Sequence, residues 1–593
     1  MAASVVPSQI AGRNMALLLL AALSPIVCHA AASPRDWDCG RANTIKSLDA
    51  LNCSVNGRVH VNTPFSLPCF SSYEGQAVEP NATACQAVQK NYASPTFRIE
   101  YPGAYMNSQD SMCSSDPADQ CDLDNTNPTD PLAYIGKDCR QGDIPSHYLE
   151  VTGVCDVKAA FSFSRSSGTP VVVKNSGHDY LSHSSQKGAL ALWTRNLQKL
   201  EYHDAFVPEG CSAGEGHRYA AITTGAGVNC DQAYNFANEN NVTILCAYSE
   251  TVGISGGWVQ TAGHSVLSPV YGLGVDRVLE FHVVTPDGQD LIANACQNQD
   301  LFWALRGGGG GTFGVVMQST HLVEPPIPMV VADIAFTSNS TTLIEWMSIL
   351  LEEAAPWADA GWGGHITGSS LIYVNPILSM DAANKSMEKA ADYATSHGGS
   401  AVFKHFDSFY GFYEEYVVAN AVTVGNTHLA GSRLIPRSVL DNEDGRKALT
   451  GFLEDIIAAG NSPYVPVSMP TIYKRDGHNT TSTTPAFYSS LWELGVGSTW
   501  AWNSTLDQRL AAVEALNNRT AQLEAVTPGG GAYMNEANPF TSDWQESWWG
   551  KENYASLLAI KNRYDPDRLL RCWRCVGWEE SDVQNSCFKA FNN

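Results

Sequence analysis

From about residue 150 onward, segments with the apolar spacing of helices alternate with apolar runs typical of strands. Helical spacing covers residues 156–164, whereas continuous apolar runs at 169–174 and 189–193 predict buried strands. Residues 219–223 and 242–245 predict further strands on either side of a helix at 230–239. This alternation predicts an α+β or α/β fold.

The pattern continues and then changes at a group of prolines. Strand-like runs at 278–285 and 312–324 enclose a helix that starts at Asn298, and Pro325, Pro326 and Pro328 interrupt the pattern. Beyond them, amphipathic helices are predicted at 342–355, 380–397 and 441–459, between strand-like pieces. Residues 39–143 are rich in Pro, Asn, Ser and Cys, which predicts a loop-rich, disulfide-stapled segment without a core of its own.

The first 32 residues have the layout of a cleaved secretory signal. Arg13 precedes an apolar stretch from Met15 to Val27, and small residues follow up to Ala32. The stretch is too short to span a membrane. Acceptor sequences for N-linked glycans occur at Asn52, Asn81, Asn241, Asn339, Asn384, Asn479, Asn503 and Asn518. We therefore expect a secreted glycoprotein that is not held at a membrane after signal cleavage.

Cysteine usage agrees with an oxidising compartment. The chain has 16 Cys, most of them near the front of the mature chain, and they are interpreted mainly as disulfides. Loss of Cys28 with the signal leaves an odd number, so at least one thiol would be unpaired or linked elsewhere. Cys572 and Cys575 with Cys587 lack a fourth zinc ligand at suitable spacing, and bridging is favoured over metal binding.

Charge excludes one class of partner. The formal net charge of -24 comes from 60 acidic and 36 basic residues, with no Lys/Arg-rich run. Such a chain repels phosphate backbones, so nucleic acid is not expected as a partner.

Three glycine-rich segments carry the candidate chemistry. They are residues 171–180 with a central His178, residues 251–276, and residues 305–316 with five consecutive glycines. Glycines let backbone amides approach a bulky ligand because no side chain keeps it away. None of the segments is a P-loop or a Gly-x-Gly-x-x-Gly dinucleotide motif, so a nicotinamide-dependent Rossmann enzyme is not expected.

Taken in order, these motifs resemble a known family. Ser-Gly-His178-Asp, Thr-Val-Gly253-Ile-Ser-Gly-Gly, Tyr-Gly-Leu-Gly-Val-Asp276, the segment from Asp300 to Val316, Asn553-Tyr554 and Tyr-Asp-Pro-Asp567 together resemble berberine-bridge-enzyme-like flavoprotein oxidases. The chain looks closest to fungal secreted members of the isoamyl-alcohol-oxidase type. The resemblance extends from about residue 125 to 580.

The resemblance implies an α+β fold of the vanillyl-alcohol-oxidase type. It implies a two-segment FAD-binding domain and a substrate domain built on an antiparallel sheet covered by helices. The expected division is a signal (1–32), a Cys-rich segment (33–125), an FAD-binding domain (126–325), a substrate domain (326–537) and a C-terminal segment (538–593) that returns to the FAD domain.

The resemblance also implies the cofactor contacts. His178 matches the histidine bonded to the flavin 8α-methyl group, and Ser249 stands where many relatives carry a second linking Cys, so FAD is expected to be attached through His178 only. Cys246, three residues earlier, is interpreted as structural. The implied cofactor-binding residues are Lys174, Asn175, Ser176, Gly177, His178, Asp179, Tyr180, Ser182, Thr251, Gly253, Ile254, Gly256, Gly257, Gly263, His264, Gly272, Asp276, Gly314, Val316, Asn553 and Tyr554.

Catalytic residues are expected around Glu536. Tyr533, Asn535 and Glu536 match a strand that lines the active site in plant relatives, where alternation would turn Tyr533 and Asn535 to one face and Glu536 to the other. Glu536 would accept a substrate proton, with apolar surroundings raising its pKa. Tyr473 and His478 are the reserve candidates, and no metal is assigned to the site.

The leading hypothesis is a secreted oxidase that moves hydride from an alcohol, amine or activated C–H substrate to FAD and reduces O₂ to H₂O₂. A tailoring enzyme for a natural product is one alternative, acting by oxidative cyclisation or by double-bond isomerisation with Glu536 as acid or base. A carbohydrate oxidase is another, with Trp258, Trp492, Trp544, Trp548 and Trp549 as possible stacking surfaces. A flavin-bearing or sugar-binding protein without turnover is the alternative outside enzymes.

Overall fold

The computed structural model describes residues 45–593 except 213, 215–217, 421–422, 476, 478–479, 581–586 and 592–593. The predicted signal, Cys28, His478 and Asn479 lie outside the described residues. Within them, no helix combines the length and the apolar character needed to cross a membrane.

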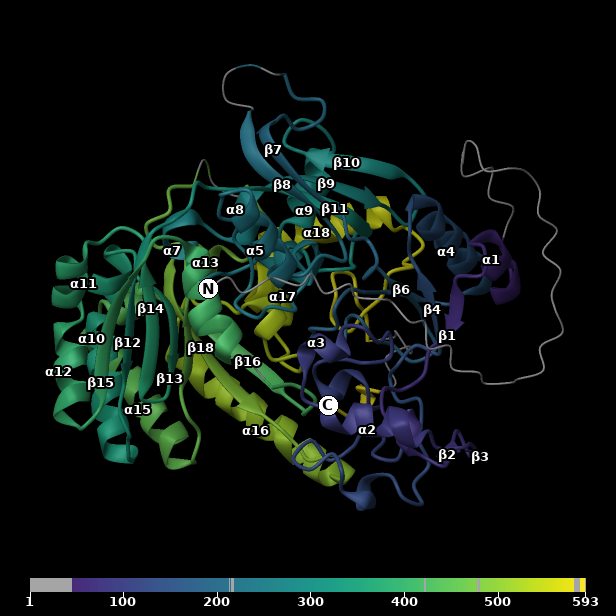
Figure 1. The fold of residues 1–593 in the computed structure, drawn as a ribbon, viewed down its shortest axis with the longest axis horizontal. Coiled ribbons are helices and arrows are strands. Elements are labelled where there is room, and N and C mark those ends of the chain that lie inside the picture. Colours follow the sequence, from purple (N-terminus) through teal and green to yellow (C-terminus); the bar gives the residue numbers. More distant parts are fainter. Residues whose placement is uncertain are drawn as a thin grey trace, which may run out of the picture. The chain divides into compact units, whose positions relative to one another are not determined.

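Two smaller sheets are formed mainly by the first half of the chain (Figure 1). The four-stranded sheet has the order β1 (Val59–Val61), β4 (His147–Glu150), β6 (Leu190–Trp193) and β5 (Val171–Lys174). The five-stranded sheet has the order β10 (Asp290–Asn294), β9 (Val278–Val284), β11 (Val315–Leu322), β8 (Tyr219–Gly225) and β7 (Leu200–Phe206). Strands β4 and β5 are both parallel to β6, whereas neighbouring strands of the five-stranded sheet are antiparallel.

The second half of the chain forms a seven-stranded antiparallel sheet. Its order is β15 (Ser400–Phe406), β12 (Met329–Ala335), β14 (Ser370–Asn375), β13 (Gly363–Thr367), β17 (Tyr464–Val467), β18 (Ser490–Ser498) and β16 (Leu429–Pro436). Helices pack on it as Figure 1 shows, and they are α10 (Ser340–Asp359), α11 (Met380–Ser386), α12 (Glu388–Ser396), α15 (Glu443–Ala458) and α16 (Leu506–Ala525).

The two faces of this sheet have different chemistry. Side chains alternate along a strand, so Ile366, Val465 and Trp492 join the apolar core with the helices. Their neighbours His365, Tyr464 and Glu493 therefore point to the opposite face. That face carries the polar groups of the site described below.

The C-terminal segment packs back against the glycine-rich part of the chain. Helix α18 (Lys551–Tyr564) lies against α9 (Gln299–Leu305) (Figure 1). The ammonium group of Lys561 is buried, and it donates to the carbonyl oxygens of Thr312 at 2.6 Å and Leu570 at 2.8 Å and to the carboxylate of Asp565 at 2.7 Å. These contacts attach the tail to the residue that follows the run of five glycines.

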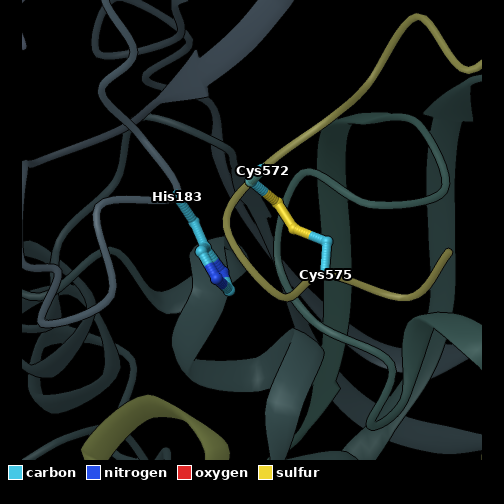
Figure 2. Close-up of side chains that lie close together, drawn as sticks. All are labelled: His183, Cys572 and Cys575. Atoms are coloured by element: carbon cyan, nitrogen blue, oxygen red, sulfur yellow. A yellow bond between two sulfur atoms is a disulfide. The ribbon is translucent and has the colours of Figure 1, made fainter. Parts of the chain in front are cut away.

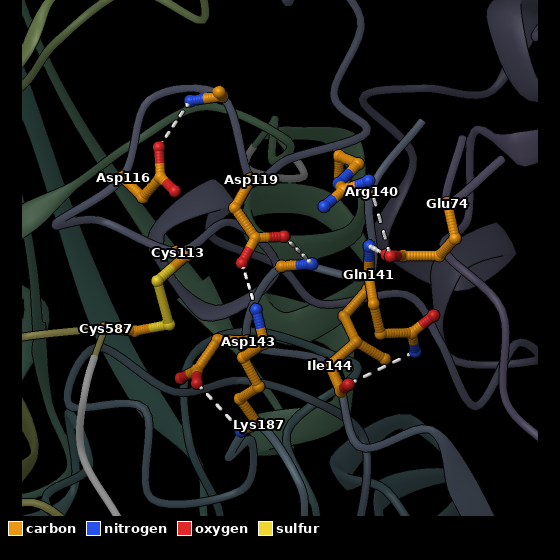
Figure 3. A network of polar contacts seen from close by, with 12 residues as sticks. Glu74, Cys113, Asp116, Asp119, Arg140, Gln141, Asp143, Ile144, Lys187 and Cys587 are labelled. Atoms are coloured by element: carbon orange, nitrogen blue, oxygen red, sulfur yellow. Dashed lines mark hydrogen bonds and ion pairs between the residues drawn. A yellow bond between two sulfur atoms is a disulfide. The ribbon is translucent and has the colours of Figure 1, made fainter. Parts of the chain in front are cut away.

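The N-terminal segment is held by disulfides and by buried polar contacts. Bridges join Cys69 to Cys85, Cys121 to Cys139, and Cys113 to Cys587 near the other end of the chain. Figure 3 shows the Cys113–Cys587 bridge beside Asp119, whose carboxylate accepts from the backbone of Gly142 at 2.9 Å and pairs with Lys187. A loop-rich segment is thus fixed by covalent and polar links, as expected, although it also has a small apolar cluster of its own around Phe70 and Tyr92.

Most predicted elements are found, and one is wrong. Residues 242–245 form no strand, because Thr243 makes only an isolated bridge with Glu324. Strand β11, which ends just before Glu324, is already paired with β8 and β9 on its two sides, so no edge is open for a ladder. The predicted helix at 380–397 is present but divided at Met387 into α11 and α12.

No described cysteine is free, so the expected odd thiol is not among them. Cys246 is bonded to Cys230, which confirms the structural interpretation of Cys246.

We expect Lys561→Met to lower the free energy of unfolding by about 3–5 kcal/mol, because it leaves the buried Asp565 carboxylate without its cation. Arg563→Gln is the control, since Arg563 pairs with Asp300 at the surface and such pairs contribute about 1 kcal/mol or less. Denaturant titration of both variants measures the difference. Equal stability of the two variants would show that the Lys561 contacts do not hold the tail.

Candidate active site

A cavity of about 480 Å³ brings together segments that are far apart in the sequence. It is lined by the turn after β5, the glycine-rich stretch from Gly253 to Trp258, and Gly310, Gly311 and Gly314. The polar face of the seven-stranded sheet adds His365 and Tyr464, and Tyr533, Asn535 and Glu536 complete the lining.

The turn after β5 is fixed at both ends. The Nε2 atom of His178 lies 2.6 Å from the hydroxyl of Thr251, which joins the first glycine-rich segment to the second. Burial lowers the pKa of His178 to about 4, so its imidazole is neutral. Lys174, at the end of β5, points away from the cavity and donates to the carbonyl oxygens of Tyr101, Pro102 and Ala104 at 3.1, 2.6 and 2.6 Å.

Close backbone approach explains two of the glycines. A Cβ atom at Gly253 would overlap the side-chain amide of Asn175, and one at Gly310 would lie 2.8 Å from the Cα of Gly257. These positions therefore require glycine for packing between the three glycine-rich segments. The run of five glycines is a tight wall of the cavity and not a linker.

An imidazole and two carboxylates lie together at one end of the cavity. His264 Nε2 is 3.1 Å from Glu536 Oε1, and its Nδ1 is 2.9 Å from the hydroxyl of Ser468. Glu493, on β18, lies within 4.8 Å of both groups, accepts from Ser432 at 2.6 Å, and has a second carboxylate oxygen that is buried without a hydrogen-bond partner. The His264–Glu536 ion pair therefore lies next to a second acid, Glu493, which is buried.

Proton affinities differ sharply between the two acids. Burial alone would raise the pKa of Glu536, but the hydrogen bond and the charge of His264 outweigh it and hold the pKa below the usual value. Burial and the negative charge of Glu536 raise the pKa of Glu493 to about 8. Glu536 is therefore ionised and Glu493 protonated at neutral pH.

The lining residues fit a flavin nucleotide. The turn at 175–177 and the glycines at 253, 256 and 257 line the cavity, and the absence of side chains at these glycines lets a pyrophosphate approach the backbone. Asn175 has a buried side-chain oxygen without a partner, available to a ligand. These residues would hold the cofactor along the wall that ends at His178.

The chain is similar to known FAD-linked proteins. Residues 145–294 match the model of an FAD binding domain, and residues 532–573 match the berberine and berberine-like model. An FAD-linked oxidoreductase of Aspergillus flavipes, ffsJ, is 40% identical, with 95% of this chain and 96% of that protein covered. The VAO-type flavoprotein oxidase VAO615 of Thermothelomyces thermophilus is 31% identical over 93% of this chain and 92% of that protein.

This chain belongs to the berberine-bridge-like, VAO-type FAD-linked oxidoreductases. The solved structure of the VAO-type flavoprotein MtVAO615 from Myceliophthora thermophila C1 superimposes with a TM-score of 0.78, at 29% identity, over 91% of this chain and 96% of that one. The VAO-type α+β fold implied by the sequence is confirmed, as is an FAD-linked enzyme.

The structure places many of the predicted residues of this FAD-linked oxidoreductase on the cavity. The predicted residues that line it are Asn175, Ser176, Gly177, His178, Asp179, Tyr180, Gly253, Gly256, Gly257, His264, Gly314, Val316, Tyr533, Asn535 and Glu536. Ser249, at the expected second-link position, also lines it.

Other predicted residues do not line the cavity. Those not among the lining residues are Lys174, Ser182, Thr251, Ile254, Gly263, Gly272, Asp276, Tyr473, Asn553 and Tyr554. Several of them hold the fold: Asp276 accepts from the backbone of Leu273 at 2.9 Å, and Asn553 donates to the carbonyl oxygen of Thr483 at 3.2 Å. Tyr473 packs against Gly272, where an added Cβ atom would lie 2.9 Å from the tyrosine ring.

Two expectations about Glu536 are wrong. Residues 534–536 form a 3-10 turn, η8 (Met534–Glu536), closed by a hydrogen bond of 2.9 Å from the Glu536 amide to the Tyr533 carbonyl. Strand alternation therefore does not apply, and Tyr533, Asn535 and Glu536 all line the same cavity. The pKa of Glu536 is lowered because His264 pairs with it, and the raised carboxyl pKa belongs to Glu493.

Sequence reasoning missed five residues of the site. His365, His428, Tyr248 and Tyr464 line the cavity, and Glu493 lies behind Glu536. Each of these five residues lies in a strand or loop whose sequence contains no recognised motif. The only available signal was the alternation in β13, β17 and β18, where one polar residue stands between apolar ones.

One further cluster borders the cavity. Figure 2 shows His183 beside Cys572 and Cys575, which are bonded to each other. His183 Nε2 is 2.6 Å from the carbonyl oxygen of Trp573, and Cys587 is bonded to Cys113. The disulfide interpretation of Cys572 and Cys575 is confirmed.

We expect Glu493→Gln to change the pH dependence of stability. The native carboxyl keeps its proton up to pH about 8, whereas the unfolded chain releases it near 4.5, so native protein binds more protons between these values. The free energy of unfolding then falls as pH rises through this window. The slope of this fall is set by the difference in bound protons between the native and unfolded states, and Gln, which cannot titrate, reduces that difference by up to about one proton. Denaturant titrations at several pH values measure it, with the exposed Glu454→Gln as control. A slope equal to that of the wild type would contradict the raised pKa.

Proposed function

We propose that the protein is an oxidase that takes hydride from an alcohol, amine or activated C–H carbon of a small molecule, with O₂ reduced to H₂O₂. The observation that carries the proposal is that Glu536, ionised and paired with His264, lines the same cavity as His178 and the three glycine-rich segments. A base and the proposed cofactor wall thus face one cavity.

Glu536 is the proposed acceptor of the substrate proton. Its carboxylate is partly accessible, whereas Glu493 is fully buried behind it. His264 holds the Glu536 carboxylate in place, and Ser468 fixes the imidazole from its other nitrogen. The bound FAD would supply the two-electron acceptor.

Asn535 and Tyr533 are proposed to orient the substrate. The Asn535 amide donates to the Tyr533 hydroxyl at 2.7 Å and to the Gly257 carbonyl at 3.2 Å, and its oxygen accepts from Thr261 at 3.0 Å. These bonds lock the η8 turn onto the cofactor wall. Substrate held by this turn would be positioned before any bond is broken.

A single covalent link through His178 is part of the proposal. Its neutral imidazole can act as a nucleophile, and because Nε2 is bonded to Thr251, Nδ1 is the nitrogen left for the flavin 8α carbon. Ser249 offers no thiolate, and the Cys230–Cys246 bridge removes the nearest sulfur. The absence of a second link would lower the flavin potential relative to doubly linked relatives.

Three further predictions accompany the activity. The division into an FAD domain at 126–325, a substrate domain at 326–537 and a returning tail at 538–593 is proposed, supported by the separate sheets.

Secretion with N-linked glycans is proposed from the signal-like start, supported by the disulfides. A natural-product tailoring reaction in the same cavity is the alternative. The absence of peroxide would distinguish redox-neutral isomerisation from oxidase turnover, whereas oxidative cyclisation also releases peroxide and is recognised by the new ring in its product.

For His178→Ala we expect flavin to be released when the protein is precipitated with acid, whereas the parent keeps its flavin. The reason is that the imidazole is the proposed attachment point. Absorbance of the supernatant measures release, and Ser249→Ala is the control that should leave retention unchanged. Retention of flavin by the His178 variant would refute the anchor.

We expect Glu536→Gln to slow flavin reduction by about 10²- to 10⁴-fold, the usual contribution of a general base. Anaerobic stopped-flow bleaching with a turned-over alcohol measures the rate, and the flavin content should remain that of the parent. Glu536→Asp should recover part of the rate because it keeps a carboxylate. An unchanged rate across pH would remove Glu536 from the mechanism.

A further inference from the structure

A second cavity shares no lining residue with the candidate active site. Its volume is about 230 Å³, and it lies at the end of helix α5 (Cys230–Glu239) and the start of helix α13 (Phe409–Phe412). These two helices contact each other (Figure 1). Helix α5 belongs to the proposed FAD domain and α13 to the proposed substrate domain, so the cavity lies at the boundary between them.

An acceptor sequence for an N-linked glycan lines this cavity. Asn241, Val242 and Thr243 form the Asn-x-Thr sequence, and all three are lining residues. None of the other described acceptor asparagines lines it. A sugar attached to Asn241 would therefore be tethered at the cavity from the moment the chain folds. We call this space the Asn241 cavity.

The fold fixes the acceptor in place. Asn241 has a φ of 55°, a left-handed conformation that Asn adopts more readily than most residues, and its amide donates to the carbonyl oxygen of Asn238 at 3.0 Å. Thr243 and Glu324 exchange two backbone hydrogen bonds, of 2.7 and 2.9 Å. The side chain of Asn241 is exposed, and within the described residues it makes no hydrogen bond. Its amide group is thus held at the surface without a partner in the protein.

The opposite side of the Asn241 cavity offers rings and polar groups. Phe409 is buried and Tyr410 is half-buried, and the Tyr410 hydroxyl donates to the side-chain oxygen of Asn235 on α5 at 2.7 Å. Asp407 and Ser408 add a carboxylate and a hydroxyl. Sugars pack their C–H faces on aromatic rings, while their hydroxyl and acetamide groups need hydrogen-bond partners. The cavity provides both kinds of contact.

The size of the cavity also suits sugar rings. Pockets for drug-sized ligands have volumes of about 300–1,000 Å³, so about 230 Å³ is enough for only the first rings of a glycan. A tethered sugar needs only weak contacts, because attachment gives it an effective concentration on the order of millimolar. Binding of a free sugar is therefore not required for the site to be occupied.

We propose that the Asn241 cavity holds the first N-acetylglucosamine of an N-linked glycan on Asn241, which packs against Tyr410 and links the proposed FAD and substrate domains. This inference rests on the proposed secretion with N-linked glycans and assigns one glycan a structural role. In the modification, Nδ2 of Asn241 loses a proton and bonds to C1 of the sugar, while the bond from C1 to the lipid diphosphate donor breaks. The glycan is then covalently joined to one domain and packed on the other.

Protection from a glycosidase tests the proposal on the full secreted chain. Endoglycosidase H cuts high-mannose glycans between their first two sugars, so a first sugar in the cavity should slow the cut. In protein secreted from a fungal host, glycopeptide mass spectrometry follows trimming at each acceptor before and after denaturation. Trimming at Asn241 should be about two- to tenfold slower in native than in denatured protein. The glycan on exposed Asn503 or Asn518, whichever is occupied, should show no such difference.

Variants of Tyr410 assign the protection to its ring. Tyr410→Ala removes the ring and should let native protein be trimmed at Asn241 as fast as at the exposed acceptor, whereas Tyr410→Phe should keep the protection. Asn241→Gln should lower the thermal midpoint of unfolding, and Asn503→Gln should leave it unchanged. In the Tyr410→Ala background, Asn241→Gln should cause no further decrease, because the contact is already lost.

The outcomes separate the cavity from the glycan proposal. An unmodified Asn241 beside occupied acceptors elsewhere would overturn the role of the cavity and leave secretion with glycans standing, as would equal trimming of the native and denatured forms. Equal shifts of the midpoint by Asn241→Gln in both backgrounds would overturn the contact with Tyr410. Absence of glycans from every acceptor of the secreted chain would refute both proposals.

Discussion

The pairing of His264 with Glu536 is the interaction on which the site depends. An ionised carboxylate can remain inside a protein only with a partner, because the loss of hydration is otherwise uncompensated. His264 supplies that partner, Ser468 orients it from the other nitrogen, and Glu493 stays protonated behind it. These groups come from a loop, a strand end, a turn and a strand interior that are up to 272 residues apart.

The seven-stranded sheet serves the core and the site at once. Alternation along β13, β17 and β18 sends one side chain to the helices and the next to the cavity, so each strand needs only one polar position to build the site. A slip of one residue in register would exchange the two sets. The apolar contacts of Ile366, Val465 and Trp492 under α10 and α15 therefore also determine where His365, Tyr464 and Glu493 point.

Among the described residues, lysine and arginine side chains hold the structure together and none of them lines the cavity. Lys174 and Lys561 are both buried and donate to backbone carbonyls, the first behind the His178 turn and the second behind the glycine wall. Each lysine lies outside the cavity and holds in place a segment that lines it. Neutral rings, glycines and small polar side chains make up most of the cavity lining, together with the paired His264 and Glu536.

The sequence by itself determined the three glycine-rich segments, because their parts are local. Glycines and His178 stand in short motifs, and a close backbone approach requires glycine wherever the chain folds, so the resemblance carried by these motifs predicted the VAO-type fold and an FAD-linked enzyme. Only the tertiary structure decided the acid–base cluster and the polar face of the seven-stranded sheet. Glu493, His365 and Tyr464 are single polar residues in ordinary strands, and their meeting with Glu536 depends on the pairing order of the sheet. The pKa of Glu536 also depends on the tertiary structure. The sequence identifies Glu536 as an acid, but the fold brings His264 next to it, and this imidazole lowers its pKa.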